Sequence, residues 1–291
     1  MTATPALEKS PRLRELKLTL RILSRNPSAA AGALIITFML LLALSAGWLA
    51  PYDPIRISLG DRLAEPSSAH WFGTDEMGRD ILSRVMFGAR VSLRLGFVIV
   101  FIAGVAGSLI GAVSGYFGRR VDNVIMRVMD VILSFPSLVL AMALAAALGP
   151  SLNNAILAVA FVMIPKFARM VRGEALAVKE MPFIAAARVS GAGHSWIILH
   201  HLLPNCLNSV IVLATLTLGD TILIAAGLSF IGLGAQPPTP EWGAMIAVGR
   251  KYVMDQWWYA AFPGFFILTT VVGFNILGDA LRDVLDPRIR R

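Results

Sequence analysis

Side chains that could carry out chemistry of their own are few in this chain of 291 residues. His200 and His201 are adjacent and would not share a helix face, which argues against a shared metal site. The single Cys206 excludes an intramolecular disulfide and any CxxC metal site. The sequence contains neither a GxxxxGK[ST] phosphate loop nor HExxH. We therefore expect no catalytic residue, cofactor or metal in this chain, and any ATP hydrolysis must come from another chain.

The most informative feature suits a mechanical role. It is the run of small side chains from Phe183 to Gly191, followed further on by Pro204. Pro182 is suited to the first turn of a helix, where its missing N–H is not needed, and Gly191 supplies a helical stop. The sequence thus predicts a short helix of about 13 Å.

The faces of this helix suggest what it does. Ile184, Ala187 and Gly191 share one face by their spacing. The alanines would let a partner's surface approach closely, with Phe183 and Ile184 as apolar anchors in a groove and Arg188 at its rim. The alternative is a short interfacial helix packed on its own subunit.

A second candidate is Asp220, which stands alone among acidic residues within an apolar segment. A charge in the middle of a membrane span is costly and usually faces a cavity or a partner. Asp220 is therefore either a polar contact on a substrate path or a pairing group for another helix. Asp130 and Arg127, three residues apart, are expected to form an ion pair within one helix.

The elements that must position these residues are membrane helices. Hydrophobic residues make up 56% of the chain and charged residues only 15%, which indicates an all-α integral membrane protein with several spans. The expected transmembrane helices are 29–50, 95–117, 126–148, 155–173, 207–231 and 257–280.

Three of these spans carry irregular features. The fourth has a short apolar part and must continue through Lys166, Arg169 and Arg172, whose long side chains can snorkel towards an interface. Pro136 in the third span and Pro263 in the sixth imply kinks or local breaks.

The charge pattern gives the orientation. Basic residues outnumber acidic ones in the N-terminal tail, at 119–127, at 166–188 and after residue 281, whereas the intervening segments are balanced. By the positive-inside rule both termini are cytoplasmic. The net charge of +8 thus reflects membrane orientation and does not indicate nucleic-acid binding. The first apolar run is longer than a signal-peptide core, so we expect an uncleaved span that contacts the lipid bilayer throughout.

The chain then divides into five parts. They are a cytoplasmic N-terminal tail (1–28), a first transmembrane helix (29–50), an extracytoplasmic segment with an amphipathic helix (51–94), a five-helix core (95–280) that includes the cytoplasmic loop 174–206, and a cytoplasmic C-terminal tail (281–291).

The amphipathic helix is expected before the second span. Thr74 can cap a helix whose first turn carries Asp75 and Glu76, favourable at the positive end of the helix dipole. Apolar residues from Ile81 to Met86 form one stripe, and polar residues recur on another. We expect this helix to lie along the outer membrane face.

The short alanine-rich segment resembles the EAA loop of ABC importer permeases, EAA-x3-G-x9-I-x-LP. Ala185 replaces the usual Glu, and His201 stands where the pattern has Ile. The resemblance implies that this loop couples the permease to an ATPase. The coupling residues it implies are Phe183, Ile184, Ala185, Ala186, Ala187, Arg188, Gly191, Leu203 and Pro204.

Three further segments resemble the C-type permease subunits of the oligopeptide, dipeptide and nickel group, most nearly those of dipeptide systems. They begin at Gly73 (GTD-x2-GRD-x2-SR-x3-GAR-x-SL), at Gly227 (GLSFIGLG, then QPPTPEWG) and at Gly278 (GDALRDVLDP). In this group an acidic residue is usual at the position of Ile224, one helical turn after Asp220.

The resemblance implies the fold and the assembly. The fold would be that of a type I ABC importer permease with six transmembrane helices, in the bacterial inner membrane. The partners would be a B-type permease in a heterodimer, two ABC ATPase subunits that bind ATP and Mg, and an extracytoplasmic peptide-binding protein. The cargo would be dipeptides or short peptides, with nickel chelates, glutathione and haem as alternatives. A secondary transporter driven by an ion gradient is a further alternative, disfavoured because no internal repeat is visible.

Overall fold

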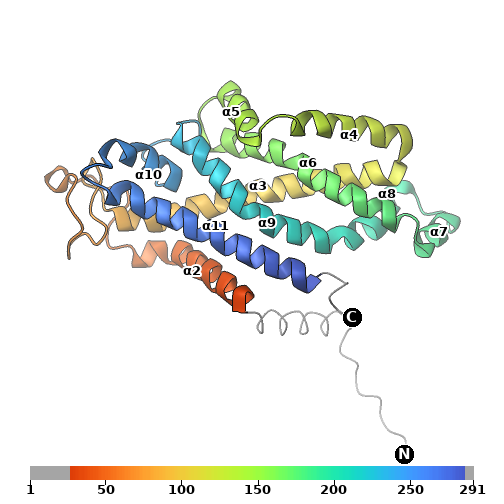
Figure 1. Cartoon of the computed structure of the whole chain (residues 1–291), viewed down its shortest axis with the longest axis horizontal. Helices are drawn as coiled ribbons and strands as arrows, with labels where there is room; N and C mark the ends of the chain where they lie inside the picture. The colour runs from red at the N-terminus through yellow and green to blue at the C-terminus, as the bar shows by residue number, and fades with distance from the viewer. Residues whose placement is uncertain (1–26, 286–291) are drawn as a thin grey trace, which may run out of the picture.

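Residues 27–285 are described by a computed structural model, in which long helices run side by side (Figure 1). The elements are α2 (Pro27–Leu49), η1 (Leu59–Asp61), α3 (Ile81–Phe117), α4 (Arg119–Leu133), α5 (Ser137–Leu148), α6 (Leu152–Val178), α7 (Pro182–Val189), α8 (His194–Ile197), η2 (Ile198–Leu202), α9 (Leu203–Phe230), α10 (Trp242–Gly249), η3 (Arg250–Tyr252) and α11 (Trp258–Leu285). Most of the expected N-terminal tail (1–26) and the last part of the C-terminal tail (286–291) lie outside the described residues.

Within residues 27–285, five helical segments are long and apolar enough to cross a membrane. They are α2, α3, α6, the continuous run from His194 to Phe230, and α11. A sixth span arises only if α4 and α5 are taken together. Five of the six expected spans are therefore found in the expected order, and the third, 126–148, is a bent pair of helices.

The third span is broken. The axes of α4 and α5 differ by 90°, so the local break expected at Pro136 is confirmed, whereas the expected bounds 126–148 are wrong because α4 begins at Arg119. Pro136 lies at the break with an extended ψ of 126°. Proline disfavours helical geometry in the residue before it, which accounts for the end of α4 just upstream. Pro263, by contrast, lies inside an uninterrupted α11.

The closest helix pairing is between α3 and α6, and it depends on glycine. Gly107, Gly111 and Gly115 recur at helical spacing along the α3 face that meets α6. A Cβ atom at Gly111 would lie 2.3 Å from the carbonyl oxygen of Ala168, closer than any real contact. Small residues that allow two backbones to approach are a principal source of helix association in membranes. The spacing of these glycines is visible in the sequence and could have predicted a close helix pairing.

The two ends of the bundle differ (Figure 1). At one end, here called the α10 end, the segment between α2 and α3 gathers with α10. At the other, the α7 end, α7 projects from the bundle, and α8 forms the first turn of the long run from His194 to Phe230. A second hydrophobic core fills the α7 end, separate from the main core between the spans.

The segment before α3 corrects one expectation. The helix begins at Ile81 and runs without interruption to Phe117, so no separate amphipathic helix lies along the membrane. Its N-cap is Asp80, whose carboxylate accepts the backbone N–H of Ser83 at 2.7 Å. Thr74 does not cap a helix but accepts a hydrogen bond from the backbone N–H of Ala64 at 2.8 Å.

Asp75 and Glu76 likewise lie in a loop and not in a helical turn. The Asp75 carboxylate is buried and accepts from Arg79 Nε at 2.6 Å, and Arg84 lies 3.4 Å away. Gly78 has a φ of +71°, and a Cβ there would lie 1.7 Å from the carbonyl oxygen of Ser58. This loop motif therefore maintains a tightly folded connection at the α10 end.

Candidate functional site

The predicted short helix is present as α7. Pro182 is its first residue and Met181 precedes it in an extended conformation. Gly191 has a φ of +82°, a region that side chains other than glycine rarely adopt. The backbone N–H of Ala192 donates to the Ala187 carbonyl and that of Gly191 to the Arg188 carbonyl, both at 3.0 Å. These two bonds form a Schellman motif, so the expected start and stop of the helix are confirmed.

One face of α7 is packed against its own chain. Ile184 is fully buried in the core of the α7 end, together with Tyr116 of α3, Val171 of α6 and Leu202 of η2. The expectation that Ile184 serves as an anchor in a partner's groove is therefore wrong. Ile184 instead anchors α7 to the long helices, with Ala187 partly buried beside it.

The opposite face of α7 is uncovered. Phe183, Ala185, Ala186 and Val189 are exposed, and Val189 has 90% of its surface free. Ala185, Ala186 and Val189 have short side chains, so this face of α7 projects little except at the aromatic ring of Phe183. Because Ala185 is on this face, the carboxylate that the EAA pattern usually has there would point away from the chain's own core.

Aromatic contacts connect α7 and α8 to α3. The Tyr116 hydroxyl and His194 Nδ1 lie 2.8 Å apart. The guanidinium carbon of Arg188 is 5.1 Å from the centre of the Tyr116 ring, within cation–π distance. Arg188, expected at the rim of a partner's groove, thus has a contact within its own chain. Tyr116 and His194 were not singled out in the sequence analysis.

Leu203 and Pro204 begin α9 without breaking the chain's path. Residues Ile198–Leu202 form a π-helical turn, and the long helix continues from His194 to Phe230. Proline removes one backbone donor and crowds the preceding turn, and a π turn is a usual way to accommodate that. Leu203 packs on the core of the α7 end, whereas Pro204 is exposed. His201 stacks edge-on against Phe183 at 6.2 Å between ring centroids.

The three basic residues of α6, expected to snorkel towards an interface, all form ion pairs. Each pairs with an aspartate on a neighbouring helix. Arg172 binds Asp122 of α4 through two hydrogen bonds, of 2.8 and 2.6 Å. The Ser114 hydroxyl donates a third bond to Asp122 at 2.6 Å, and that aspartate is buried.

The second pair corrects a further expectation. Asp130 does not pair with Arg127 but accepts from Arg169 Nη2 at 2.7 Å. The third pair involves Asp220, whose carboxylate lies 3.7 Å from Lys166 Nζ. All four of these side chains remain partly uncovered, by 36% to 57%. Acidic and basic residues placed at similar depths in neighbouring spans were the signal that could have predicted these pairs.

At the α10 end, Glu241 caps α10 from a buried position. Its carboxylate accepts the backbone N–H of Ala244 at 2.8 Å and the hydroxyl of Ser92 at 3.1 Å. Burial raises the pKa of the Glu241 carboxyl, and the backbone donors at Gly243 and Ala244 act in the opposite direction. This group is enclosed by its own chain and is not a ligand contact.

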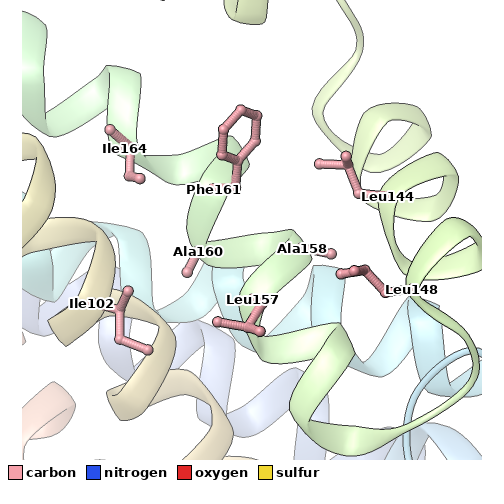
Figure 2. A pocket seen from close by; sticks show the side chains of 8 residues that line it. All are labelled: Ile102, Leu144, Leu148, Leu157, Ala158, Ala160, Phe161 and Ile164. Atoms are coloured by element: carbon pink, nitrogen blue, oxygen red, sulfur yellow. The ribbon is translucent and has the colours of Figure 1, made fainter.

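One groove between the helices is apolar. Figure 2 shows it between α3, α5 and α6, with a volume of about 350 Å³. Leu144 and Leu148 of α5 face Leu157 and Phe161 of α6 across it. A surface of this kind suits acyl chains or another apolar helix and offers nothing to a charged ligand. Within residues 27–285 no group of three His, Cys, Asp or Glu side chains is placed to hold a metal ion.

Comparison with known families gives two matches. Residues 107–291 match the family described as "Binding-protein-dependent transport system inner membrane component". Residues 15–66 match the "N-terminal TM domain of oligopeptide transport permease C". The first match covers more than half of the chain, and residues 67–106 lie between the two.

Similar proteins are permeases. The chain is 54% identical to the probable D,D-dipeptide transport system permease protein DdpC of Escherichia coli K12, covering 97% of this chain and 94% of that protein. It is 46% identical to the dipeptide transport system permease protein DppC of Alkalihalophilus pseudofirmus, over 92% and 88%. It is also 46% identical to the glutathione transport system permease protein GsiD of Escherichia coli O6:K15:H31, over 91% and 88%.

A solved structure supports the fold. A chain of the MetNI methionine ABC transporter, in an inward-facing conformation, matches with a TM-score of 0.55 and 22% identity. The match covers 70% of this chain and 97% of that one.

Proposed function

Because the chain belongs to the binding-protein-dependent inner membrane permeases, as a C-type subunit of the oligopeptide and dipeptide group, we propose that it carries short peptides inward while ATPase subunits act on α7. It is a multi-pass membrane component of a bacterial ABC importer and is not itself an ATPase.

The observation that carries the coupling proposal is the division of α7 into two faces. Ile184 fixes one face to α3, α6 and η2, while Phe183, Ala185 and Ala186 leave the other uncovered. A helix held in this way transmits a push on its free face to the spans that hold it. The free face fits helix-in-groove binding, in which small side chains allow close approach.

The assembly we propose follows from this assignment. The α7 end lies in the cytoplasm with both termini, and the α10 end faces outward. Two ATPase subunits contact the α7 end, one on this chain and one on a B-type permease that completes a heterodimer. An extracytoplasmic binding protein delivers cargo to the α10 end.

The names of the similar proteins favour short peptides as the cargo. Two similar proteins are named for dipeptides and one for glutathione, itself a short peptide with charged ends. Nickel chelates and haem are not supported by any of these names. Peptide uptake is thus the first activity to measure.

The mechanism is a rigid-body displacement. Closure of the ATPases on ATP moves the docked α7, and Ile184 and Tyr116 transmit that movement to α6 and α3. Because packed helices switch between discrete arrangements, a small shift at α7 tilts the spans and changes which side the path opens to.

The test is uptake by the assembled transporter. This chain is reconstituted into liposomes with its partner permease, ATPases and binding protein, and radiolabelled dialanine is supplied outside. We expect uptake that requires ATP and persists when ionophores collapse the proton and sodium gradients. Uptake that needs a gradient and no ATP would refute the proposal.

A further inference from the structure

A band of four charged side chains lies on one uncovered face of the bundle. It consists of Lys166 and Arg169 of α6, Asp220 of α9 and Asp130 of α4, and is called the charge band below. Lys166 and Arg169 are three residues apart and share a helix face. The charges therefore alternate in sign across α9, α6 and α4.

Helix length places Lys166 and Asp220 of the charge band within the membrane. Lys166 is about 21 Å along α6 from its start at Leu152, and Asp220 is about 15 Å along α9 from its end at Phe230. The hydrocarbon core of a bilayer is about 30 Å thick, so both residues are near its middle. Charged groups at that depth are costly against lipid, and they usually border water or protein.

The face of α6 that carries the charge band is open beyond the ion pairs themselves. Gly173 continues the same α6 face towards the α7 end, and nothing lies within 4 Å of the position its Cβ would take. On the other side, α5 packs against both α6 and α9. The face is thus flanked by α4 and α9, limited by α5, and open towards the α7 end. The apolar groove of Figure 2 is lined instead by α3, α5 and α6 and contains no charge.

We propose that the charge band contacts the charged ends of a peptide in transit. Lys166 or Arg169 binds the carboxylate of the peptide, and Asp220 or Asp130 binds its ammonium group. The side chains whose ion-pair partners are replaced in this way then face water. Two residues of extended chain span about 7 Å, and side chains three apart on a helix, such as Lys166 and Arg169, have Cβ atoms about 5 to 6 Å apart, so one dipeptide can reach both ion pairs. This assignment rests on the proposed function and adds the chemical feature of the cargo that the permease itself recognises.

Weak, exchangeable contacts are suited to this role. Partly exposed ion pairs contribute little to stability, so exchanging one partner for a peptide terminus costs little. Transport also requires that cargo binds well enough to enter and weakly enough to leave.

The first experiment measures access to water. Lys166→Cys is made in the full transporter with cysteine-free partners, and a hydrophilic, membrane-impermeant maleimide is applied from the α7 side. The parent chain, whose Cys206 is buried, gives the baseline, and Phe101→Cys on an apolar uncovered face is the control. We expect labelling at position 166 only, slowed by binding protein loaded with dialanine. Protection of position 166 in the assembled transporter, with labelling in the chain alone, would show that the second permease covers the charge band and would overturn the proposal.

The second experiment measures coupling. Asp220→Asn is compared with Asp255→Asn, which lies on an exposed loop outside the charge band. At saturating loaded binding protein, we expect Asp220→Asn to reduce dialanine transported per ATP hydrolysed about tenfold, the loss of one charged contact. The stimulated ATPase rate should not change, whereas a merely structural role would lower both.

The outcomes separate this inference from the proposed function. A parent transporter that shows no ATP-driven uptake contradicts the proposed function. If the parent transports dialanine and Asp220→Asn transports as much dialanine per ATP hydrolysed as the parent, the role proposed for the charge band is contradicted and the proposed function is not.

Discussion

Gly191 and Ile184 define what individual residues contribute at α7. Gly191 ends the helix in a left-handed conformation, and Ile184 attaches the helix to the core. The space around Gly191 is open, so glycine is required there for its backbone conformation and not because a side chain would clash. This distinction separates two glycines that look alike in the sequence, Gly191 and Gly193.

Replacing Gly191 with Ala should impair coupling. A side chain in the left-handed region costs about 1 to 2 kcal/mol, which would loosen the Schellman motif at the end of α7. We expect lower binding-protein-stimulated ATPase activity and uptake, with normal insertion into the membrane. Gly193→Ala is the matched control, because Gly193 has a φ of −67° and equally open space. Equal effects of the two substitutions would contradict the conformational argument.

The buried ion pair of α4 and α6 gives a second prediction at this scale. Arg172→Met leaves the buried Asp122 without its main partner, a change that costs about 3 to 5 kcal/mol. Arg169→Met leaves Asp130 largely exposed and should cost about 0 to 1 kcal/mol. Thermal unfolding of the two variants in detergent measures the difference. A greater loss from Arg169→Met would show that the burial of Asp122 does not govern the stability of this contact.

At the scale of elements, the α3–α6 pair is the axis to which the others attach. Its glycine face allows the two backbones to touch, and both helices reach the core of the α7 end through Tyr116 and Val171. A displacement of α7 therefore acts on the most tightly packed pair in the described part of the bundle.

Replacing Gly111 with Val should separate this pair. The added side chain would overlap the Ala168 carbonyl, and overpacking costs about 1 to 3 kcal/mol or more. We expect a lower unfolding temperature and loss of uptake. Gly173→Val on α6 is the control for stability, because nothing lies within 4 Å of its Cβ position. Unchanged stability of Gly111→Val would mean that the two helices do not approach as closely as described.

The elements also illustrate what a single sequence can predict. The lengths of the apolar runs were sufficient to predict most of the spans, and Pro182 with Gly191 was sufficient to predict α7, because both signals are local in the sequence. Pro136 was sufficient to predict a break after α4 but not its angle of 90°, and the Asp80 cap was missed because Thr74 satisfied the local rule equally well. Pairing of Asp220 with another helix was one of two alternatives, but its partner Lys166 and the Arg169 partner of Asp130 were not predicted, because these pairs join helices whose relative rotation is set by packing.

At the scale of the whole molecule, the two ends of the bundle have different characters. The α10 end is closed by folded loops with buried Asp75 and Glu241, whereas the α7 end presents a short helix with an uncovered face. A permease that receives cargo at one end and a mechanical push at the other would need this division. We propose that the ATPase subunit binds at α7.

The most direct measurement of that claim is photocrosslinking in the assembled transporter. Benzoylphenylalanine is placed at Ala186 on the uncovered face or, as the control, at the buried Ile184 two residues away. We predict that the probe at Ala186 crosslinks to an ATPase subunit and that the probe at Ile184 crosslinks within the chain. A probe at Ala186 that reacts only with lipid, or with its own chain, would contradict the account.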